Sequence, residues 1–221
     1  MRVLVTGTDT GIGKTTVCAL LHAGLEAAGL HAGYFKAAQT GDDDDTATFE
    51  WLRPSALTLQ PSYRLAAPQA PWRAALLEGA SIDLARIGAD FAARAPRDAW
   101  LVEGAGGLTV PLTATMDYRD LARALGLSVL VVASTRLGTI NHTRLTVEAA
   151  CNAGLRVLGV VLNGPPDEGL RGCLDALLAP LSVEVVAECP ELTPLEPTRV
   201  AADGRSCFPA RTVVALRERA A

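Results

Sequence analysis

The fold is decided near the N-terminus by Gly7-Thr8-Asp9-Thr10-Gly11-Ile12-Gly13-Lys14-Thr15-Thr16. The apolar run VLVT at positions 3–6 precedes this stretch and predicts a buried strand. After it, one helical face is predicted by the spacing of Val17, Leu20, Leu21 and Leu25. The ten residues therefore join the end of a strand to the start of a helix through a glycine-rich turn.

A turn of this kind is an anion site, because backbone N–H groups at a helix N-terminus point at the ligand. Glycines let those groups approach phosphate oxygens without a Cβ in the way. We expect Lys14 to neutralise the β- and γ-phosphates of a nucleotide and Thr15 to place its hydroxyl on magnesium. The usual spacing GxxxxGK[ST] is not met, because Thr8 stands where the first glycine belongs. The strand–helix context of Gly13-Lys14-Thr15 still favours a phosphate loop over an ordinary turn.

Apolar, partly β-branched runs recur outward from this loop, at residues 2–6, 31–35, 100–102, 128–133, 156–162 and 183–186. Near-continuous apolar character is typical of parallel strands covered on both faces. Helical spacing separates the runs, after Ser81 and at residues 118–125, 140–152 and 167–178. We expect one α/β domain over residues 1–221, a P-loop NTPase with a mostly parallel sheet flanked by helices on both faces. Residues 54–71 and those after Pro190 are expected to be irregular.

The composition excludes several classes of protein. The chain is 49% hydrophobic and 20% charged, which is too apolar for a disordered protein. Its formal charge of −4 gives no basic footprint for nucleic acid, and no run approaches the ~20 apolar residues of a membrane span. Asp9 ends the first apolar run too early for a signal peptide. Five cysteines, odd in number and without a CxxC pair, predict reduced thiols in a cytoplasmic protein.

Charged residues follow two more of the expected strands. Lys36 comes just after one strand, and Glu103 ends the middle one. Open α/β sheets bind ligands at the carboxyl edge, so Lys36 and Lys14 are candidates to face one anionic centre, although a solvated lysine fits the local sequence equally well. Magnesium needs further oxygen ligands, and we expect Glu103 and one acid of Asp42-Asp43-Asp44-Asp45 to supply them.

Five segments together resemble the dethiobiotin synthetase family: GTDTGIGKTT (7–16), GYFKAAQTG (33–41), VEGAGG (102–107), LGTINHTRLT (137–146) and GVVLNG (159–164). They occur in the family's order and spacing, and the resemblance extends from Val3 to about Leu192. It implies an ATP- and magnesium-dependent cyclo-ligase. In that reaction 7,8-diaminononanoate takes up carbon dioxide (or bicarbonate) as a carbamate, which attacks the γ-phosphate. The resulting carbamic–phosphoric anhydride is closed by the second amine to give dethiobiotin, ADP and phosphate.

The resemblance also implies roles for individual residues. The catalytic residues would be Lys36, Lys14 and Thr10. The magnesium ligands would be Thr15, Asp45 and Glu103, with Asp45 preferred among the acids because it opens the next expected helix. Nucleotide contacts would come from Gly11, Ile12, Gly13, Lys14, Thr15, Thr16, Asp45, Glu103, Gly104, Ala105, Gly106, Asn163, Gly164, Pro190, Glu191 and Leu192. Substrate contacts would come from Lys36, Thr40, Gly106, Leu137, Thr139 and Asn141, the last three from the neighbouring subunit of a homodimer.

This sequence departs from the family pattern near the substrate. Ala37-Ala38 stands where Pro-Val is common, and Ala70-Pro71-Trp72 replaces a usual Ser-Pro-His. Three alternatives share the fold or the loop: a partitioning or septum-positioning ATPase, a cobyrinate-type amidotransferase and a catalytically inactive paralogue. The first carries a lysine where Asp9 stands, and the second needs a glutaminase domain for which 221 residues leave no room. Intact Lys14, Lys36 and Glu103 argue against the third.

Overall fold

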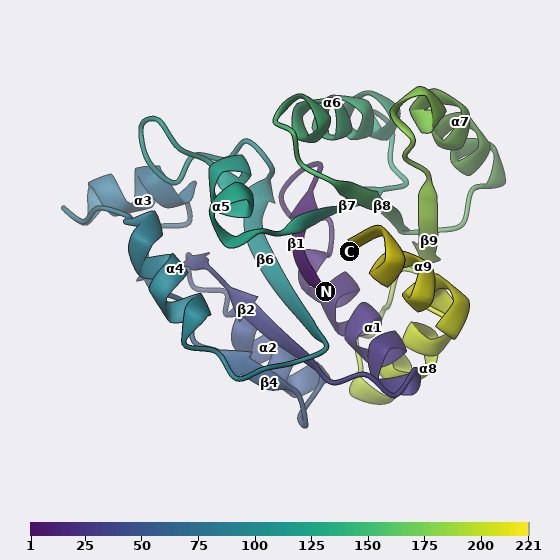
Figure 1. Cartoon of the computed structure of the whole chain (residues 1–221), viewed down its shortest axis with the longest axis horizontal. Coiled ribbons are helices and arrows are strands. Elements are labelled where there is room, and N and C mark those ends of the chain that lie inside the picture. The colour runs from purple at the N-terminus through teal and green to yellow at the C-terminus, as the bar shows by residue number, and fades with distance from the viewer. Residues whose placement is uncertain (221) are drawn as a thin grey trace.

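A seven-stranded sheet runs through the centre of the protein (Figure 1). The structure, a computed structural model, describes residues 1–220, apart from the side chain of residue 168. The strand order is β4-β2-β6-β1-β7-β8-β9, and all neighbouring strands are parallel. These strands are β1 (Arg2–Gly7), β2 (Ala32–Lys36), β4 (Leu57–Leu59), β6 (Ala99–Gly107), β7 (Ser128–Ser134), β8 (Val157–Asn163) and β9 (Val185–Cys189). Two short strands, β3 (Ala38–Thr40) and β5 (Tyr63–Leu65), form a separate parallel pair.

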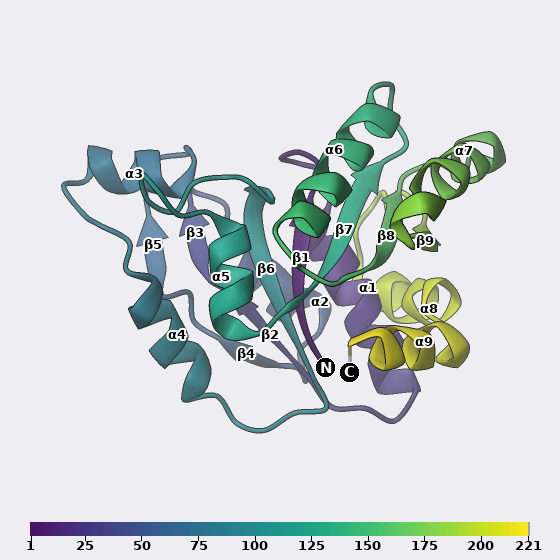
Figure 2. The same cartoon turned by 45° about the horizontal axis from the view of Figure 1, so that its top comes forward.

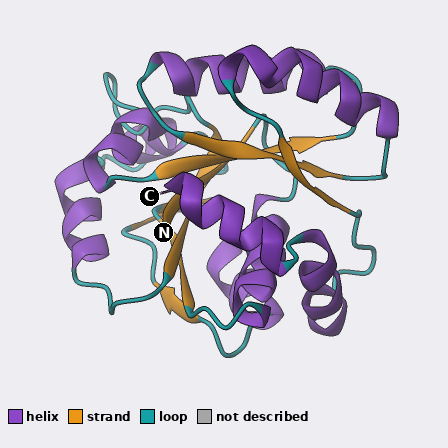
Figure 3. Cartoon of the chain, turned by 45° about the vertical axis from the view of Figure 1, so that its right-hand side comes forward, coloured by secondary structure: helices purple, strands orange, loops and turns teal. Residues whose placement is uncertain are grey.

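Helices cover both faces of the sheet, which Figures 2 and 3 show from two further directions. One face packs against α1 (Lys14–Ala27), α2 (Asp45–Leu52), α8 (Pro197–Cys207) and α9 (Ala210–Ala220). The other face packs against α3 (Pro71–Leu77), α4 (Leu84–Ala92), α5 (Tyr118–Leu125), α6 (Thr139–Asn152) and α7 (Glu168–Leu178), which is followed by the short 3₁₀ helix Ala179–Leu181. Alternate residues of β1 enter the two cores, since Val3 and Val5 join one and Leu4 the other. The expected parallel sheet with helices on both faces is confirmed.

The strand order reverses at β1, which lies between β6 and β7 in the middle of the sheet. In open α/β sheets the ligand crevice lies outside the carboxyl ends of the strands at such a reversal. The carboxyl ends of β1, β6 and β2 meet there, and the loop from β1 into α1 covers the same edge. No helix within residues 1–220 is long and apolar enough to cross a membrane.

The expectation of irregular structure fails in two places. Residues 54–71 contain β4 and β5, and the chain after Pro190 contains α8 and α9. Strands of three residues show too little periodicity to be recognised. The helix α8 was missed because its buried side carries Gly204, a poor helix former; a Cβ there would lie 2.5 Å from the Leu20 carbonyl oxygen of α1. The glycine is thus required by close packing between α8 and α1.

Two boundaries also differ from expectation. The strand β6 does not end at Glu103 but continues to Gly107, and its pairing with β1 is irregular between Val5 and Gly7. Gly106, at φ +66°, adopts the left-handed conformation there, and this lets the strand bend past the phosphate loop. The helix expected after Ser81 begins at Leu84, with Asp83 as its N-cap through a hydrogen bond from the Ala85 amide.

Candidate active site

Strand register brings Lys36 and Glu103 together. The two residues are paired across β2 and β6, and side chains paired in a parallel sheet point to the same face. The Lys36 Nζ lies 2.8 Å from Glu103 Oε1 and also donates to the Gly104 carbonyl oxygen at 3.1 Å. Both side chains are buried. Lys36 is therefore a buried residue that lines the crevice, and not a solvated lysine at a strand end.

The start of α2 supplies a second carboxylate. The Lys36 Nζ lies 2.6 Å from Asp45 Oδ2, and the Thr15 hydroxyl donates to Asp45 Oδ1 at 2.9 Å and lies 3.1 Å from Glu103 Oε1. Of the four consecutive acids, Asp44 instead caps α2 through the Ala47 amide and pairs with Arg64. Asp45 is thus the acid of this run that contacts Lys36 and Thr15. It is also the acid that the sequence analysis preferred.

The charges at this edge perturb one another. Burial lowers the pKa of Lys36, but the adjacent carboxylates Glu103 and Asp45 reverse the effect, so the pKa lies above its ordinary value. Burial raises the pKa of Asp45, yet Lys36, the Thr15 hydroxyl and Lys14 together outweigh burial and hold it below its usual value. Burial lowers the pKa of Lys14, and Lys36 lowers it further, against the attraction of Glu103. Two lysines and two carboxylates therefore form one coupled group of charges.

The phosphate loop has the conformation that its glycines predict. Gly11 (φ +70°) and Gly13 (φ +83°) are both left-handed, and Gly13 is the N-cap residue of α1. No side chain caps this helix, so the backbone N–H groups of its first turn face the crevice. Lys14 is buried, and its Nζ bends back to the Asp9 carbonyl oxygen at 3.4 Å. The loop thus provides free amide donors and an ammonium at one helix end.

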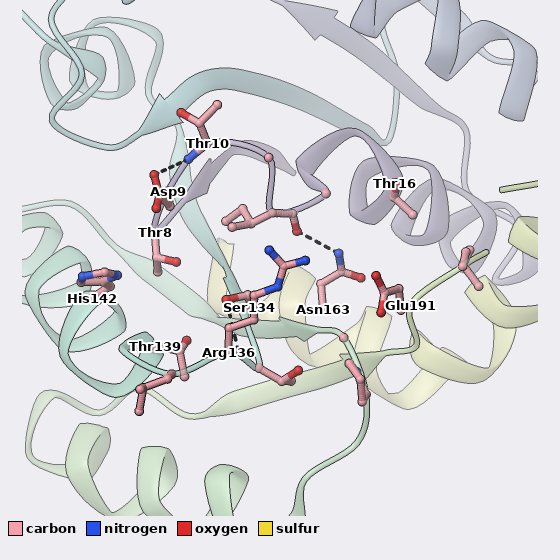
Figure 4. Close-up of a pocket in the computed structure, with 18 of the residues that line it drawn as sticks. Thr8, Asp9, Thr10, Thr16, Ser134, Arg136, Thr139, His142, Asn163 and Glu191 are labelled. Atoms are coloured by element: carbon pink, nitrogen blue, oxygen red, sulfur yellow. Dashed lines mark hydrogen bonds between the residues drawn. The ribbon is translucent and has the colours of Figure 1, made fainter. Parts of the chain in front are cut away.

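Two cavities flank the phosphate loop. The first, about 350 Å³, is here called the lysine cavity and is lined by Thr10, Gly11, Gly13, Lys14, Thr15, Thr16, Lys36, Gln39, Thr40, Asp43, Asp45, Glu103, Ala105 and Gly106. The second, about 360 Å³, is here called the asparagine cavity and is shown in Figure 4. Its lining includes Thr8, Asp9, Thr10, Gly11, Ile12, Gly13, Arg136, Asn163, Gly164, Glu191 and Leu192. Both cavities share Thr10 and the loop glycines, so one elongated ligand can occupy both across the loop.

Asn163 at the end of β8 is fixed by the loop itself. Its Nδ2 donates to the Ile12 carbonyl oxygen at 2.8 Å (Figure 4). Its Oδ1 is buried and has no hydrogen-bond partner among residues 1–220. A buried acceptor without a partner is costly, so the amide oxygen is available to a donor group of a ligand.

Some predicted contacts lie outside the lysine cavity. Leu137 and Thr139 line the asparagine cavity, while Asn141 lines a third cavity of about 680 Å³ between α6 and α7. Pro190 is absent from the lining of the asparagine cavity, although Glu191 and Leu192 belong to it. Within one chain, the predicted substrate residues are therefore divided between Lys36 and the start of α6.

Sequence reasoning missed three polar residues of the site. Gln39 accepts from the Asp45 amide at 3.1 Å and donates to the Asp43 carbonyl oxygen at 2.7 Å, which fixes the turn into α2. Arg136 points into the asparagine cavity (Figure 4). Tyr34, inside β2, donates its hydroxyl to Glu103 Oε2 at 2.9 Å. Burial and Glu103 raise the pKa of Tyr34 well above its ordinary value. A polar residue within a buried apolar run was a sequence signal for Tyr34.

The oxygens of Thr15, Asp45 and Glu103 match the ligands that magnesium prefers. Within residues 1–220, no group of three or more His, Cys, Asp or Glu side chains could hold a metal ion by itself. Magnesium is commonly held by one or two carboxylates together with substrate phosphates and water, so this smaller donor set fits the ion when a nucleotide is present.

Comparison with known proteins agrees with this geometry. A family model described as an AAA domain matches residues 1–199. The ATP-dependent dethiobiotin synthetase BioD of Anaeromyxobacter sp. (strain K) is 52% identical over 176 residues, which are 75% of this chain and 78% of that protein. The protein of the same name from Bacillus velezensis is 37% identical over 196 residues, covering 85% of this chain and 83% of the relative.

Solved structures share the fold. The MinC:MinD cell division protein complex of Aquifex aeolicus contains a chain that matches with a TM-score of 0.57 and 15% identity, over 99% of this chain and 94% of that one. Identity this low supports the architecture alone. The curated relatives carry the assignment, because their similarity covers most of both sequences. The chain belongs to the family of ATP-dependent dethiobiotin synthetases.

Proposed function

We propose that this chain is an ATP-dependent dethiobiotin synthetase, a ligase that forms the ureido ring of dethiobiotin from 7,8-diaminononanoate and carbon dioxide and releases ADP and phosphate. We further propose that residues 1–221 act as one nucleotide-binding domain. The observation that carries the proposal is the convergence of Lys14, Lys36, Thr15, Asp45 and Glu103 in the lysine cavity. A carbamate and a triphosphate are both anions, and concentrated positive charge is what brings them together.

In the proposed reaction, one substrate amine adds to carbon dioxide and loses a proton to give a carbamate. A carbamate oxygen then attacks the γ-phosphorus, and ADP leaves. The second amine attacks the carbonyl carbon of the resulting anhydride, and the departure of phosphate closes the ring. No side-chain nucleophile is required, so the protein acts mainly by positioning and by charge neutralisation.

Each residue of the lysine cavity has a proposed task in this scheme. Lys36, whose ammonium is held at the carboxyl end of β2, binds the carbamate and the oxygens transferred with the γ-phosphate. Lys14 and the amides of the loop bind the β- and γ-phosphates, and Thr10 lies where the carbamate meets them. Thr40, at the end of β3, lines the same cavity and contacts the diamine. Thr15, Asp45 and Glu103 hold magnesium, which neutralises charge on the phosphates when it is bound.

The nucleoside part of ATP is assigned to the asparagine cavity. Asn163 is suited to the adenine edge because its Oδ1 has no partner among the described residues and its Nδ2 is already used by Ile12. Glu191 and Leu192 approach from the loop after β9. ATP would then lie across the loop, with its phosphates directed to Lys14.

We also propose a homodimer with substrate sites at the interface. The start of α6 does not line the lysine cavity of its own chain. Ile140 and Leu145 are exposed on this helix, and Leu137 is exposed just before it. The helix N-terminus, with Gly138 as N-cap and no side-chain cap, would receive the substrate carboxylate of a neighbouring subunit.

The five free cysteines agree with a reducing compartment such as the cytoplasm.

The function is tested by coupled phosphate release with ATP and magnesium. Phosphate should appear only when 7,8-diaminononanoate and bicarbonate are both present, and mass spectrometry should detect dethiobiotin. ATP turnover that is indifferent to the diamine would refute the proposal. Light scattering after size exclusion tests the dimer separately, since a monomer at assay concentration would contradict it.

A further inference from the structure

Tyr34 is a buried polar residue that the proposed reaction does not use. It lies inside β2, two residues before Lys36 and on the same side of the strand. Its side chain is completely buried, and it is not among the residues that line the lysine cavity. An effect of Tyr34 on the site would therefore have to pass through the residues that it contacts.

The hydroxyl of Tyr34 bonds to the Glu103 carboxylate oxygen that Lys36 does not contact. Glu103 Oε1 accepts from Lys36 at 2.8 Å and lies 3.1 Å from the Thr15 hydroxyl, whereas Oε2 accepts from Tyr34 at 2.9 Å. The terminal torsion of a glutamate is broad, so a carboxylate bound through only one oxygen is free to rotate. The bond from Tyr34 holds the other oxygen and leaves Oε1 facing the cavity.

The ring of Tyr34 is connected to the second carboxylate. It stacks on Phe49 of α2 with ring centroids 4.0 Å apart and planes inclined by 7°. Phe49 lies four residues after Asp45, one turn further along the same helix face. The same side chain thus fixes the glutamate by its hydroxyl and the helix that carries Asp45 by its ring.

We propose that Tyr34 is a positioning residue that orients Glu103 and helps to set its spacing from Asp45 for a divalent cation. This inference rests on the magnesium site of the proposed function. Residues that hold metal-binding side chains in place commonly affect metal affinity by 10- to 100-fold. Loss of the hydroxyl should therefore weaken cation binding, and it should leave the reaction rate at saturating cation largely unchanged.

The test is the variant Tyr34→Phe, which retains the ring and its stacking. Binding of Mn²⁺, used as a paramagnetic probe in place of magnesium, is measured by electron paramagnetic resonance with ADP present. We expect the variant to bind Mn²⁺ about 10-fold more weakly. In the phosphate-release assay, the magnesium concentration for half-maximal rate should rise by a similar factor, with kcat at saturating magnesium within about threefold of the original protein.

Tyr118→Phe is the matched control. Tyr118 is also completely buried, a Cβ added at Gly104 would lie 3.5 Å from its ring, and its hydroxyl, unlike that of Tyr34, makes no hydrogen bond to Glu103. It should leave Mn²⁺ affinity unchanged. A second variant, Phe49→Leu, removes the stacking but keeps the hydroxyl of Tyr34, and it should weaken Mn²⁺ binding less than Tyr34→Phe does.

The inference is overturned if Tyr34→Phe binds Mn²⁺ as tightly as the original protein, or if Tyr118→Phe weakens binding equally. It is overturned too if the original protein with ADP binds no Mn²⁺. The Mn²⁺ measurement needs no diamine and no turnover. Failure of the proposed function, which appears as diamine-independent ATP turnover, is therefore distinguishable from failure of the role of Tyr34.

Discussion

Replacement of Lys36 by methionine removes the charge that joins the two carboxylates of the site. The ammonium of Lys36 is buried and lies 2.6 Å from Asp45 and 2.8 Å from Glu103. The Thr15 hydroxyl lies 2.9 Å from Asp45 and 3.1 Å from Glu103, so without the lysine two carboxylates face one another around one hydroxyl. Breaking a buried ion pair by removing one partner costs about 3–5 kcal/mol. At roughly 2–4 °C per kcal/mol for a protein of this length, the melting temperature should fall by about 6–20 °C.

The same variant separates folding from catalysis when magnesium is added. A divalent cation supplies the charge that the lysine provided, so magnesium with ADP should raise the melting temperature of Lys36→Met more than that of the original protein. Activity should not recover, because a preorganised donor at the transferred phosphate contributes about 10²–10³-fold to the rate. Scanning calorimetry and the phosphate-release assay measure the two effects independently.

Two outcomes would refute this reasoning. An unchanged melting temperature would mean that the ammonium does not compensate the charge of Asp45 and Glu103. Full activity at saturating magnesium would mean that Lys36 does not act on the transferred phosphate. Lys36→Arg is the matching control: it keeps a positive charge, so it should lose less stability, but its planar guanidinium should not restore the rate.

Three further predictions concern nucleotide binding, the pH dependence of stability and the packing of the helices. Asn163→Ala should raise the KM for ATP about 10-fold with little change in kcat, because the hydrogen bond to the ligand and the bond that Asn163 donates to Ile12 are both lost outside the lysine cavity; an equal fall in kcat would contradict this. Burial lowers the pKa of His22 to about 4, so the native state resists its protonation. The free energy of unfolding should therefore be unaffected by this group above pH 6.5 and should fall by about 3 kcal/mol as the pH falls toward 4. His22→Gln should remove this part of the pH dependence, which urea titrations at several pH values measure. Gly204→Ala should destabilise by about 1–3 kcal/mol, because the added methyl meets the Leu20 carbonyl oxygen. Gly172→Ala in α7, with open space around it, should instead stabilise by up to about 1 kcal/mol; opposite signs in the same denaturation assay are required.

The sequence predicts those parts of the site that follow from strand ends. Lys14 and Thr15 are positioned by a local strand–turn–helix connection, and that geometry is contained in ten consecutive residues. Lys36 and Glu103 lie 67 residues apart, yet a parallel sheet places the carboxyl ends of its strands along one edge. Asp45 was preferred among four acids through the family resemblance, in which an aspartate opens this helix; in the structure Asp45 does open α2, and Asp44 is the N-cap.

Packing between helices is harder to infer from the sequence. Gly204 lowers the helix propensity of its own segment. What it allows is close packing of α8 against Leu20 and Ala23 of α1. A partner so distant along the chain leaves no periodic trace in residues 197–207. The short strands β4 and β5 are also hard to infer from the sequence. Three residues show no clear pattern of their own, so these strands form only because they pair with neighbouring strands.

Tyr34 indicates where a sequence signal was present but was not used. In a strand buried on both faces, each residue is expected to be apolar, so a hydroxyl needs a partner. Side chains alternate along a strand, and the residue two positions before a strand-end lysine points to the same face as that lysine. A polar residue at that position therefore points toward the buried side of the site, and its hydrogen-bond partner should be sought on the neighbouring strand. For Tyr34 that strand is β6, and the partner is Glu103.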